Sequence, residues 1–296
     1  MDRNTFIITV YCLIVETYKT VAKKYKIRRG GFPPALTDAE VITMEICGAY
    51  FKLHSDKDLF AYFHSHYHHF FPRLRERSSF VRHAADLWQV KAAIWHLIIH
   101  QSGQAAAPVQ VIDTMPLPVC TYTRSGRDRC FKTVADYGHC AAKKMDYDGF
   151  KLGLRVSVMG MITHFPLLSA RAHDVNHTNA LVEGFTGLCP ADKGFISPFR
   201  QALLCDRYGV KIVTPAKSNM KEEPHALRKF CSRIRKIVET VGSHLTERFA
   251  VDAIRVHDLW HFQHRLIRKI VSHTVMVFLN IQLGRDPLDL DGLVTS

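Results

Sequence analysis

The first hundred residues place apolar side chains at helical spacing. Six of them recur at steps of four and three and so fall on one face of a predicted helix: Ile7, Tyr11, Ile14, Tyr18, Val21 and Tyr25. Paired glycines and prolines in residues 28–34 end this helix. The capping-box spacing at Thr37–Glu40 then predicts a second helix to about Phe51. A further helix is expected from Ser78 to about His100.

After residue 101 the pattern changes from helical to strand-like. Residues 102–108 (SGQAAAP) are small and mark the expected boundary between two domains. A short apolar stretch precedes residues 190–194, and β-branched or apolar runs predict strands at 109–114, 151–160, 161–170 and 210–214. Helices are expected between and after them, at 178–185, 197–207, 224–241 and 259–283. The sequence therefore predicts an all-α domain over residues 1–107 and an α/β domain, a mixed sheet flanked by helices, over residues 108–296.

The chain is strongly basic. It has 40 Lys and Arg against 27 Asp and Glu, a formal net charge of +13, while its 47% hydrophobic content is that of a globular protein. Most of the excess lies in residues 1–108 and 193–296, and the segment between them is nearly balanced because it is rich in carboxylates. A basic chain is expected to bind a polyanion, most often nucleic acid and in some proteins a membrane surface.

The eight cysteines contain no C-x-x-C pair, as expected for reduced thiols in a cytoplasmic protein. A zinc site is an alternative for a set that recurs every ten residues: Cys120, Cys130 and Cys140, with His139. The apolar run at 6–15 lacks a signal-peptide cleavage site, and the uncharged run at 271–283 is too short to span a bilayer. We therefore expect a cytoplasmic protein without a membrane partner.

Three acidic residues stand where their carboxylates could meet. Asp113 follows the Val and Ile of the first predicted strand and Asp192 follows another apolar segment, so both are expected at the carboxyl edge of the sheet, where ligands bind. Glu239 lies in a helix four residues after Arg235, with which it can pair. Converging carboxylates need a cation, and oxygen ligands select Mg²⁺ or Mn²⁺. Taken singly, each of the three also fits a turn residue or a surface ion pair.

The residues around these carboxylates resemble the DDE transposases of bacterial insertion sequences. The order of the motifs agrees across about residues 108–283, and the matching segments are 113–120 (DTMPLPVC), 149–152 (GFKL), 191–195 (ADKGF) and the pair Arg235 and Glu239. The resemblance implies a ribonuclease H-like core, related in mechanism to retroviral integrases. It also implies that Asp113, Asp192 and Glu239 are the catalytic residues and hold two Mg²⁺ or Mn²⁺ ions. The implied activity is that of a DNA transposase, which cleaves element ends and transfers their 3′-hydroxyls into target DNA.

The resemblance is less complete in the last motif. Part of the superfamily has a Tyr three residues before the Arg and a Lys seven residues after the Glu, where this chain has Ser232 and Thr246. Arg248 or Lys236 could take over their role. The first hundred residues match more loosely, and they fit a helix-turn-helix-type DNA reader and a helical packing module equally well.

A basic stretch leads to Glu239. Residues 217–236 contain seven basic side chains and two Glu, which favours a track for DNA phosphates over an ordinary solvated surface. The candidates for DNA contact come from this stretch and from the matched motifs: Lys151, Lys193, Lys217, Lys229, Arg233, Arg235 and Lys236. The expected partners are double-stranded DNA, as terminal repeats and as target, and a second copy of the chain, because two DNA ends must be paired.

Two weaker signals and two rival functions remain. The four histidines in residues 64–69 (HSHYHH) fit a polar helix edge or a loop better than a transition-metal site. His173, Asp174 and His177 fit either a metal site or an accessory to the active site, and Asp174 is expected in a loop that returns to the sheet edge. The rivals are a metal-dependent DNA nuclease of the same fold and a DNA-binding protein with an inactive core.

Overall fold

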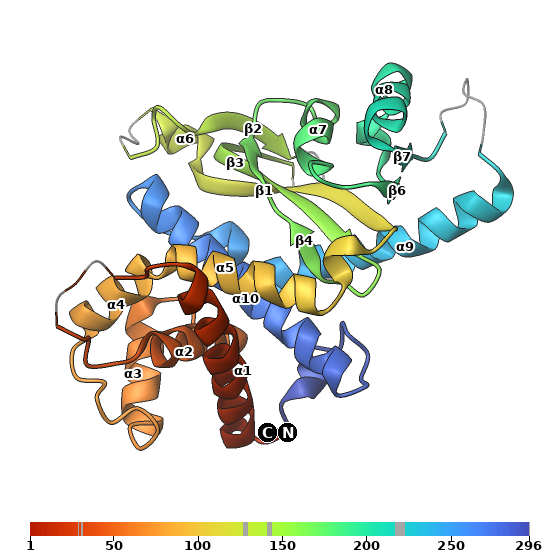
Figure 1. Cartoon of the computed structure of the whole chain (residues 1–296). Coiled ribbons are helices and arrows are strands. Elements are labelled where there is room, and N and C mark those ends of the chain that lie inside the picture. The colour runs from red at the N-terminus through yellow and green to blue at the C-terminus, as the bar shows by residue number, and fades with distance from the viewer. Residues whose placement is uncertain (29, 31, 127–129, 141–143, 217–222, 296) are drawn as a thin grey trace. The chain divides into compact units, whose positions relative to one another are not determined.

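The computed structural model describes residues 1–28, 30, 32–126, 130–140, 144–216 and 223–295. The chain divides into two compact units, coloured along the sequence in Figure 1. The helical unit comprises Met1–Gln101, His244–Val256 and Trp260–Ser296, and the sheet unit comprises Ser102–Ser243 and His257–Leu259. The helical unit thus contains both ends of the chain, and the Met1 ammonium donates to the Leu293 carbonyl (3.1 Å).

The helical unit is built from α1 (Arg3–Lys24), α2 (Asp38–Tyr50), α3 (Asp56–His66), α4 (Arg77–Asp86) and α5 (Trp88–Gln101). After the sheet unit the chain returns through short helical turns, η4 (His244–Arg248) and η5 (Val251–Ala253), to the long helix α10 (Leu259–Gln282), and η6 (Asp291–Leu293) follows it.

The buried face of α1 differs in part from the predicted stripe. It consists of Phe6, Ile7, Val10, Ile14, Thr17 and Val21. Tyr11 and Tyr25, two members of the predicted apolar stripe, are 37% and 61% exposed, so that stripe is only partly buried. Tyr25 caps the helix, and its extended backbone (φ −127°, ψ 133°) directs the chain out of the helical repeat.

By length and composition α1 could also cross a membrane. It has 22 residues and a mean hydropathy of 1.3 over its most apolar window, and no other described helix meets the same criterion. The core helix of a soluble protein passes this test as well, so the finding is weak evidence. Here the Phe6 ring packs on the Tyr50 ring of α2, with centroids 4.8 Å apart.

The predicted capping box is confirmed. The Glu40 backbone N–H donates to the Thr37 hydroxyl (3.2 Å), the Thr37 N–H donates to Glu40 Oε2 (2.6 Å), and α2 ends at Tyr50. The single helix expected from residue 78 to 100 was wrong, because α4 and α5 are separated at the buried residue Leu87. Neither Gly nor Pro marks that break, so the apolar periodicity could not locate it. Helix α3 was not predicted.

Buried charged side chains tie α10 into the helical unit. Lys91 of α5 is fully buried, donates to Glu45 Oε2 of α2 (2.6 Å) and contacts His264 Nδ1 of α10 (3.0 Å). Arg268 of α10, 2% exposed, donates to Asp56 of α3 (2.8 Å). The predicted division had assigned this last helix to the catalytic domain over residues 108–296, whereas its contacts group it with the helices that begin the chain.

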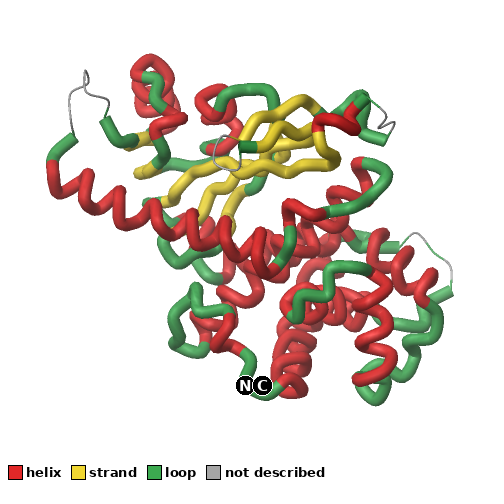
Figure 2. Tube along the Cα trace, turned by 180° about the vertical axis from the view of Figure 1, so that it is seen from behind, coloured by secondary structure: helices red, strands yellow, loops and turns green. Residues whose placement is uncertain are grey.

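The sheet unit contains, in chain order, η1 (Gln104–Ala106), β1 (Gln110–Thr121), α6 (Tyr122–Ser125), β2 (Asp136–Cys140), β3 (Met145–Ser157), β4 (Ile162–His164), β5 (Leu167–Ser169), η2 (Asp174–His177), α7 (Thr178–Leu181), β6 (Gly187–Pro190), η3 (Lys193–Phe195), α8 (Pro198–Tyr208), β7 (Val210–Val213) and α9 (His225–Ser243). Antiparallel β1 and β3 form its centre, and β2, β4 and β5 pair with β3. Parallel β6 and β7 join β1 through a bridge between Val109 and Leu188. Helices α7 and α8 cover one face, and α9 runs along the other (Figures 1 and 2).

The predicted mixed sheet is confirmed, but its strands differ in detail. The first strand does not end at Thr114 and continues to Thr121. Pro116 and Pro118 fit because proline is tolerated where its nitrogen faces an unpaired edge, and β3 is the only described partner of β1 over this stretch. The two strands predicted at 151–170 are one long β3 followed by two short strands, and β2 was not predicted.

Candidate active site

The register of the sheet places Asp113 beside Asp192. Val109 and Leu188 form a parallel bridge, and the two aspartates each follow four residues later. Adjacent strands lie about 4.8 Å apart, so the same parallel register brings the two carboxylates next to each other. Asp113 is therefore not at the end of a strand, as predicted, but within β1, and it meets Asp192 because β6 is the strand that ends there.

Gly187 permits this approach of β6 to the start of β1. The Leu188 N–H donates to the Pro108 carbonyl oxygen (2.9 Å). A β-carbon on Gly187 would lie 2.3 Å from the same oxygen, and the φ of +134° favours glycine. A larger residue would push β6 away from β1, and with it Asp192 away from Asp113.

Strand alternation decides which face carries the site. Ile112 and Ala191, each one residue before an aspartate of the pair, are buried in the core that includes Leu181 of α7 and Leu204 of α8. Successive side chains of a strand point to opposite faces, so Asp113 points to the face that α9 covers (Figure 1).

Helix α9 brings Arg235 and Glu239 to that face. Its inner stripe, at helical spacing, consists of Cys231, Ile234, Val238 and Val241. The Arg235 guanidinium lies 2.9 Å from Asp192 Oδ1 and 3.9 Å from Glu239 Oε1. The predicted Arg235–Glu239 pair is thus present, and the same guanidinium also stands between Asp192 and Glu239.

A fourth carboxylate, Asp174, lies near enough for its charge to raise the pKa of Asp113, although Thr114, to which it is bound, points to the other face of β1. The Thr114 hydroxyl and the Lys151 ammonium both donate to Asp174 Oδ1 (2.8 and 2.9 Å). A β-carbon on Gly194 would lie 3.2 Å from Asp174 Oδ2, so the turn that follows Asp192 passes directly against this carboxylate. The predicted return of Asp174 to the sheet edge is confirmed, and its contacts link β1, β3 and the Asp192 turn.

The environment raises the pKa of Asp113 from 3.8 to about 6. Burial is the main cause, and the negative charges of Asp174 and Asp192 add to it. The Thr114 N–H, which donates to Asp113 Oδ1 (2.8 Å), and the charge of Arg235 partly oppose the rise. Asp113 therefore feels the repulsion expected where carboxylates converge.

This pKa predicts a pH-dependent effect of Asp113→Asn on the metal-free protein. The folded pKa lies above the unfolded value, so the folded state is favoured while the carboxyl is protonated, and that advantage is lost as the pH rises from about 4 to about 6. Because the side chain is partly exposed, removing its charge should raise the free energy of unfolding at pH 7 by about 1–2 kcal/mol, and by close to nothing at pH 4. Urea denaturation in EDTA at both pH values measures this. A variant less stable than the parent at pH 7 would contradict it.

The carboxylates of the site are ligands of the type that a divalent cation prefers. Carboxylate oxygens are hard ligands of the type Mg²⁺ and Mn²⁺ prefer, and a bound cation would offset both the burial of the Asp113 carboxylate and its repulsion by Asp174 and Asp192. Within the residues that the structure describes, however, no three His, Cys, Asp or Glu side chains lie close enough together to hold a metal ion. The structure brings Asp113 and Asp192 together, and the Arg235 guanidinium contacts both Asp192 and Glu239.

The predicted DNA-contact residues fall into two groups. Lys151 and Arg235 are engaged with carboxylates of the site, and Lys151 also donates to the Ala172 carbonyl (2.9 Å). Exposed side chains belong to Lys193, beside Asp192, and to a stripe at steps of four and three along α9: Lys229, Arg233 and Lys236. Lys217 lies outside the described residues.

Other candidates from the sequence are not part of this site. Arg248 belongs to the helical unit, where it donates to the Tyr50 carbonyl (2.9 Å) and pairs with Asp291. The cysteines are free thiols, and the described residues contain no zinc site built from them. The histidines of residues 64–69 are exposed at the end of α3, where the His64 ring stacks on Phe60 (5.5 Å).

Comparison with protein families identifies the sheet unit. Residues 103–259, more than half of the chain, match the family described as the transposase DDE domain. The chain therefore belongs to this family, and it is a DDE transposase. Comparisons with curated proteins and with solved structures give no significant match.

Membership of this family confirms the resemblance to DDE transposases that the sequence motifs indicated. It also has implications for the fold and the chemistry. The family implies a ribonuclease H-like core, with which the mixed sheet and its flanking helices agree. It also implies phosphoryl transfer on DNA and, in general, divalent metal ions. The match covers residues 103–259, so it stops at the first residue of α10 and does not include the helices before residue 103.

Proposed function

We propose that this transposase cleaves DNA strands at the ends of an insertion sequence and transfers the exposed 3′-hydroxyls into target DNA. The observation that carries the proposal is the pairing of Asp113 with Asp192 on the α9 face of a DDE domain, where burial, together with the charges of Asp174 and Asp192, raises the pKa of Asp113 to about 6. A site that concentrates negative charge in this way supports cation-assisted phosphoryl transfer.

Asp113, Asp192 and Glu239 would hold two Mg²⁺ or Mn²⁺ ions. When bound, such ions activate the attacking water or 3′-hydroxyl and stabilise the leaving oxygen of the phosphodiester. The protein's own part is to hold these carboxylates in position. Arg235 balances the charge of Asp192 and Glu239, and Asp174 supports the turn that carries Asp192.

The DNA itself would lie along α9. The exposed Lys229, Arg233 and Lys236 lead along the helix toward Glu239, so a phosphate backbone bound on them approaches the carboxylates. Joining two element ends to one target calls for two copies of the chain, hence a homodimer. The protein would act in the bacterial cytoplasm, on nucleoid DNA.

Metal dependence is the first prediction of this function. All-oxygen ligation predicts cleavage with Mg²⁺ or Mn²⁺ and inhibition by Ca²⁺, which binds such ligands with longer and looser geometry. Cleavage of labelled DNA in each metal, with EDTA as the blank, measures it. Activity that survives full chelation would rule out the two-ion mechanism.

The deciding experiment uses DNA that carries the inverted repeats flanking the element, with Mg²⁺ and a supercoiled target plasmid. Cut ends joined to the target identify a transposase. Cut ends without joined products would favour a nuclease of the same fold. Binding without any cleavage would favour an inactive DNA-binding protein.

A further inference from the structure

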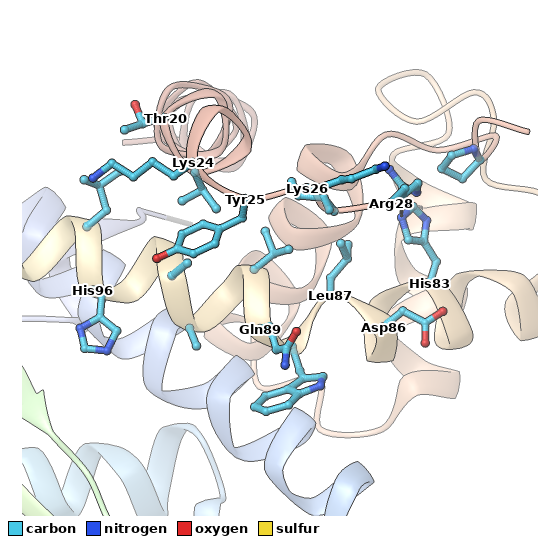
Figure 3. Close-up of a pocket in the computed structure, with 18 of the residues that line it drawn as sticks. Thr20, Lys24, Tyr25, Lys26, Arg28, His83, Asp86, Leu87, Gln89 and His96 are labelled. Carbon is cyan, nitrogen blue, oxygen red and sulfur yellow. Dashed lines mark hydrogen bonds between the residues drawn. The ribbon is translucent and has the colours of Figure 1, made fainter. Parts of the chain in front are cut away.

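A groove in the helical unit lies outside the phosphoryl-transfer site. Its volume is about 1180 Å³, and side chains from the end of α1, the segment after it, α4 and α5 line it (Figure 3). All of its lining residues belong to the helical unit. Pockets for drug-sized ligands measure about 300–1,000 Å³, so this groove has room for something larger than one small molecule.

The lining is cationic. The described lining residues include one carboxylate, Asp86, and four cations: Lys24, Lys26, Arg82 and Arg28, the last of which pairs with the buried Asp38 beside the groove. Figure 3 shows the lysine of α1 on one side of the groove and the arginine of the following segment on the other. Such an excess of positive charge selects a ligand with several negative charges, as a phosphate backbone has.

Three aromatic residues belong to the lining: Tyr25, Phe32 and Trp88. Tyr25 is 61% exposed and projects from the end of α1 toward α5 (Figure 3). Trp88, the first residue of α5, is half-buried in the same lining. Phenol and indole rings stack on nucleobases of any sequence, and cations combined with stacking rings are typical of proteins that bind single strands.

A buried carboxylate fixes one wall of the groove. Asp38 is 3% exposed and accepts hydrogen bonds from Tyr18 Oη (2.5 Å) and Arg28 Nη1 (2.9 Å). Its Oδ1 lies 2.6 Å from His83 Nε2 on α4. Burial alone would raise the pKa of Asp38, but these hydrogen bonds lower it, so the carboxylate stays charged. Arg28 is thus held at the groove before a ligand arrives, which reduces the ordering cost of binding.

We propose that this groove binds an unpaired stretch of DNA strand, with phosphates on Lys24 and Arg82 and bases stacked on Tyr25 and Trp88. A duplex is recognised by a protruding helix or ribbon that enters its major groove, whereas a hollow admits bases only when they are unpaired. The choice of DNA over another single-stranded polymer rests on the proposed function. The existence of the groove and the nature of its lining are independent of that function.

The test measures binding of the full-length chain in EDTA to a fluorescent oligo-dT of about ten nucleotides. Tyr25→Ala should weaken binding about tenfold, the size of one lost base stack. Lys24→Gln with Arg82→Gln should shallow the slope of log K against log salt by about 1.4, at about 0.7 for each lost phosphate contact. An oligonucleotide with 5-bromouracil should photocrosslink to a peptide that contains Tyr25 or Trp88.

Matched controls lie on the same helix. Tyr11→Ala, and Lys19→Gln with Lys23→Gln, change exposed side chains of α1 outside the groove and should leave oligo-dT binding unchanged. The groove variants should also leave binding to random duplex unchanged. Unchanged oligo-dT binding in the groove variants, an equal loss on duplex, or a preference for oligo-U over oligo-dT would each overturn the proposal.

The groove proposal and the proposed function can be tested independently of each other. Asp192→Asn should leave oligo-dT binding intact, because its carboxylate belongs to the sheet unit. A chain that binds oligo-dT through this groove, yet neither cleaves nor joins DNA, would refute the proposed reaction and keep the groove as a strand-binding site.

Discussion

Asp192→Asn should lower the rate of Mg²⁺-dependent DNA cleavage by more than about a hundredfold, with DNA affinity unchanged. The substitution keeps the shape of the side chain and removes the charge that would hold a metal ion. Asp113→Asn and Glu239→Gln should have the same effect. For Glu239 the result is the more informative, because its contact in the structure is with the Arg235 guanidinium, which also binds Asp192.

Single-turnover cleavage of end-labelled DNA measures the loss, and a gel-shift assay in EDTA measures binding. Asp206→Asn is the matched control: this exposed aspartate lies on α8, across the sheet from α9, and its replacement should be tolerated. If any one of the three variants still cleaves at the parent rate, that residue is not a catalytic ligand and the site must be reassigned to its neighbours, Asp174 first.

Local signals in the sequence predicted the elements that carry the site. The Thr37–Glu40 capping box started α2 where expected, because a cap depends only on residues three apart. The apolar spacing of α9 likewise predicted that Arg235 and Glu239 share one side of the helix, and the two groups are 3.9 Å apart. Such features depend on neighbours along the chain, which the sequence contains directly.

Contacts between residues far apart along the chain could not be predicted from such local signals. The strand pattern gave Asp113 and Asp192 as strand ends, but their proximity depends on the Val109–Leu188 bridge and on the close approach at Gly187. The second contact of Arg235, to Asp192, joins residues more than forty positions apart. No periodicity encodes such a contact.

The assignment of α10 shows the same limit. Its apolar stripe and its basic residues are those of any surface helix, so the sequence placed it with the preceding α/β segment. In the structure Arg268 is buried against Asp56, and His264 lies 3.0 Å from Lys91. A charged residue is rarely buried without a partner, but the sequence does not identify that partner.

Replacing Lys229, Arg233 and Lys236 together by Gln should weaken DNA binding about equally on specific and random duplexes. Each phosphate contact contributes about 0.9 to the slope of log K against log salt, so the slope should fall by two to three units if all three touch phosphate. Between about 50 and about 200 mM salt the parent protein should then lose up to roughly fortyfold more affinity than the variant. The three side chains are exposed on one side of α9, so their removal should not disturb its buried stripe.

Fluorescence anisotropy on both duplexes over a salt series gives the slopes, and Arg207→Gln supplies the control. Arg207 is an exposed cation on α8, on the opposite face of the sheet, and its loss should leave the slope unchanged. Preference for the terminal repeat should survive in the triple variant, because phosphate contacts hold the duplex and base contacts select the sequence. An unchanged slope would make this side of α9 an ordinary solvated surface and move the duplex elsewhere. A lost preference with an unchanged slope would instead place base contacts on α9, so that the helix leading to Glu239 would also select the DNA sequence.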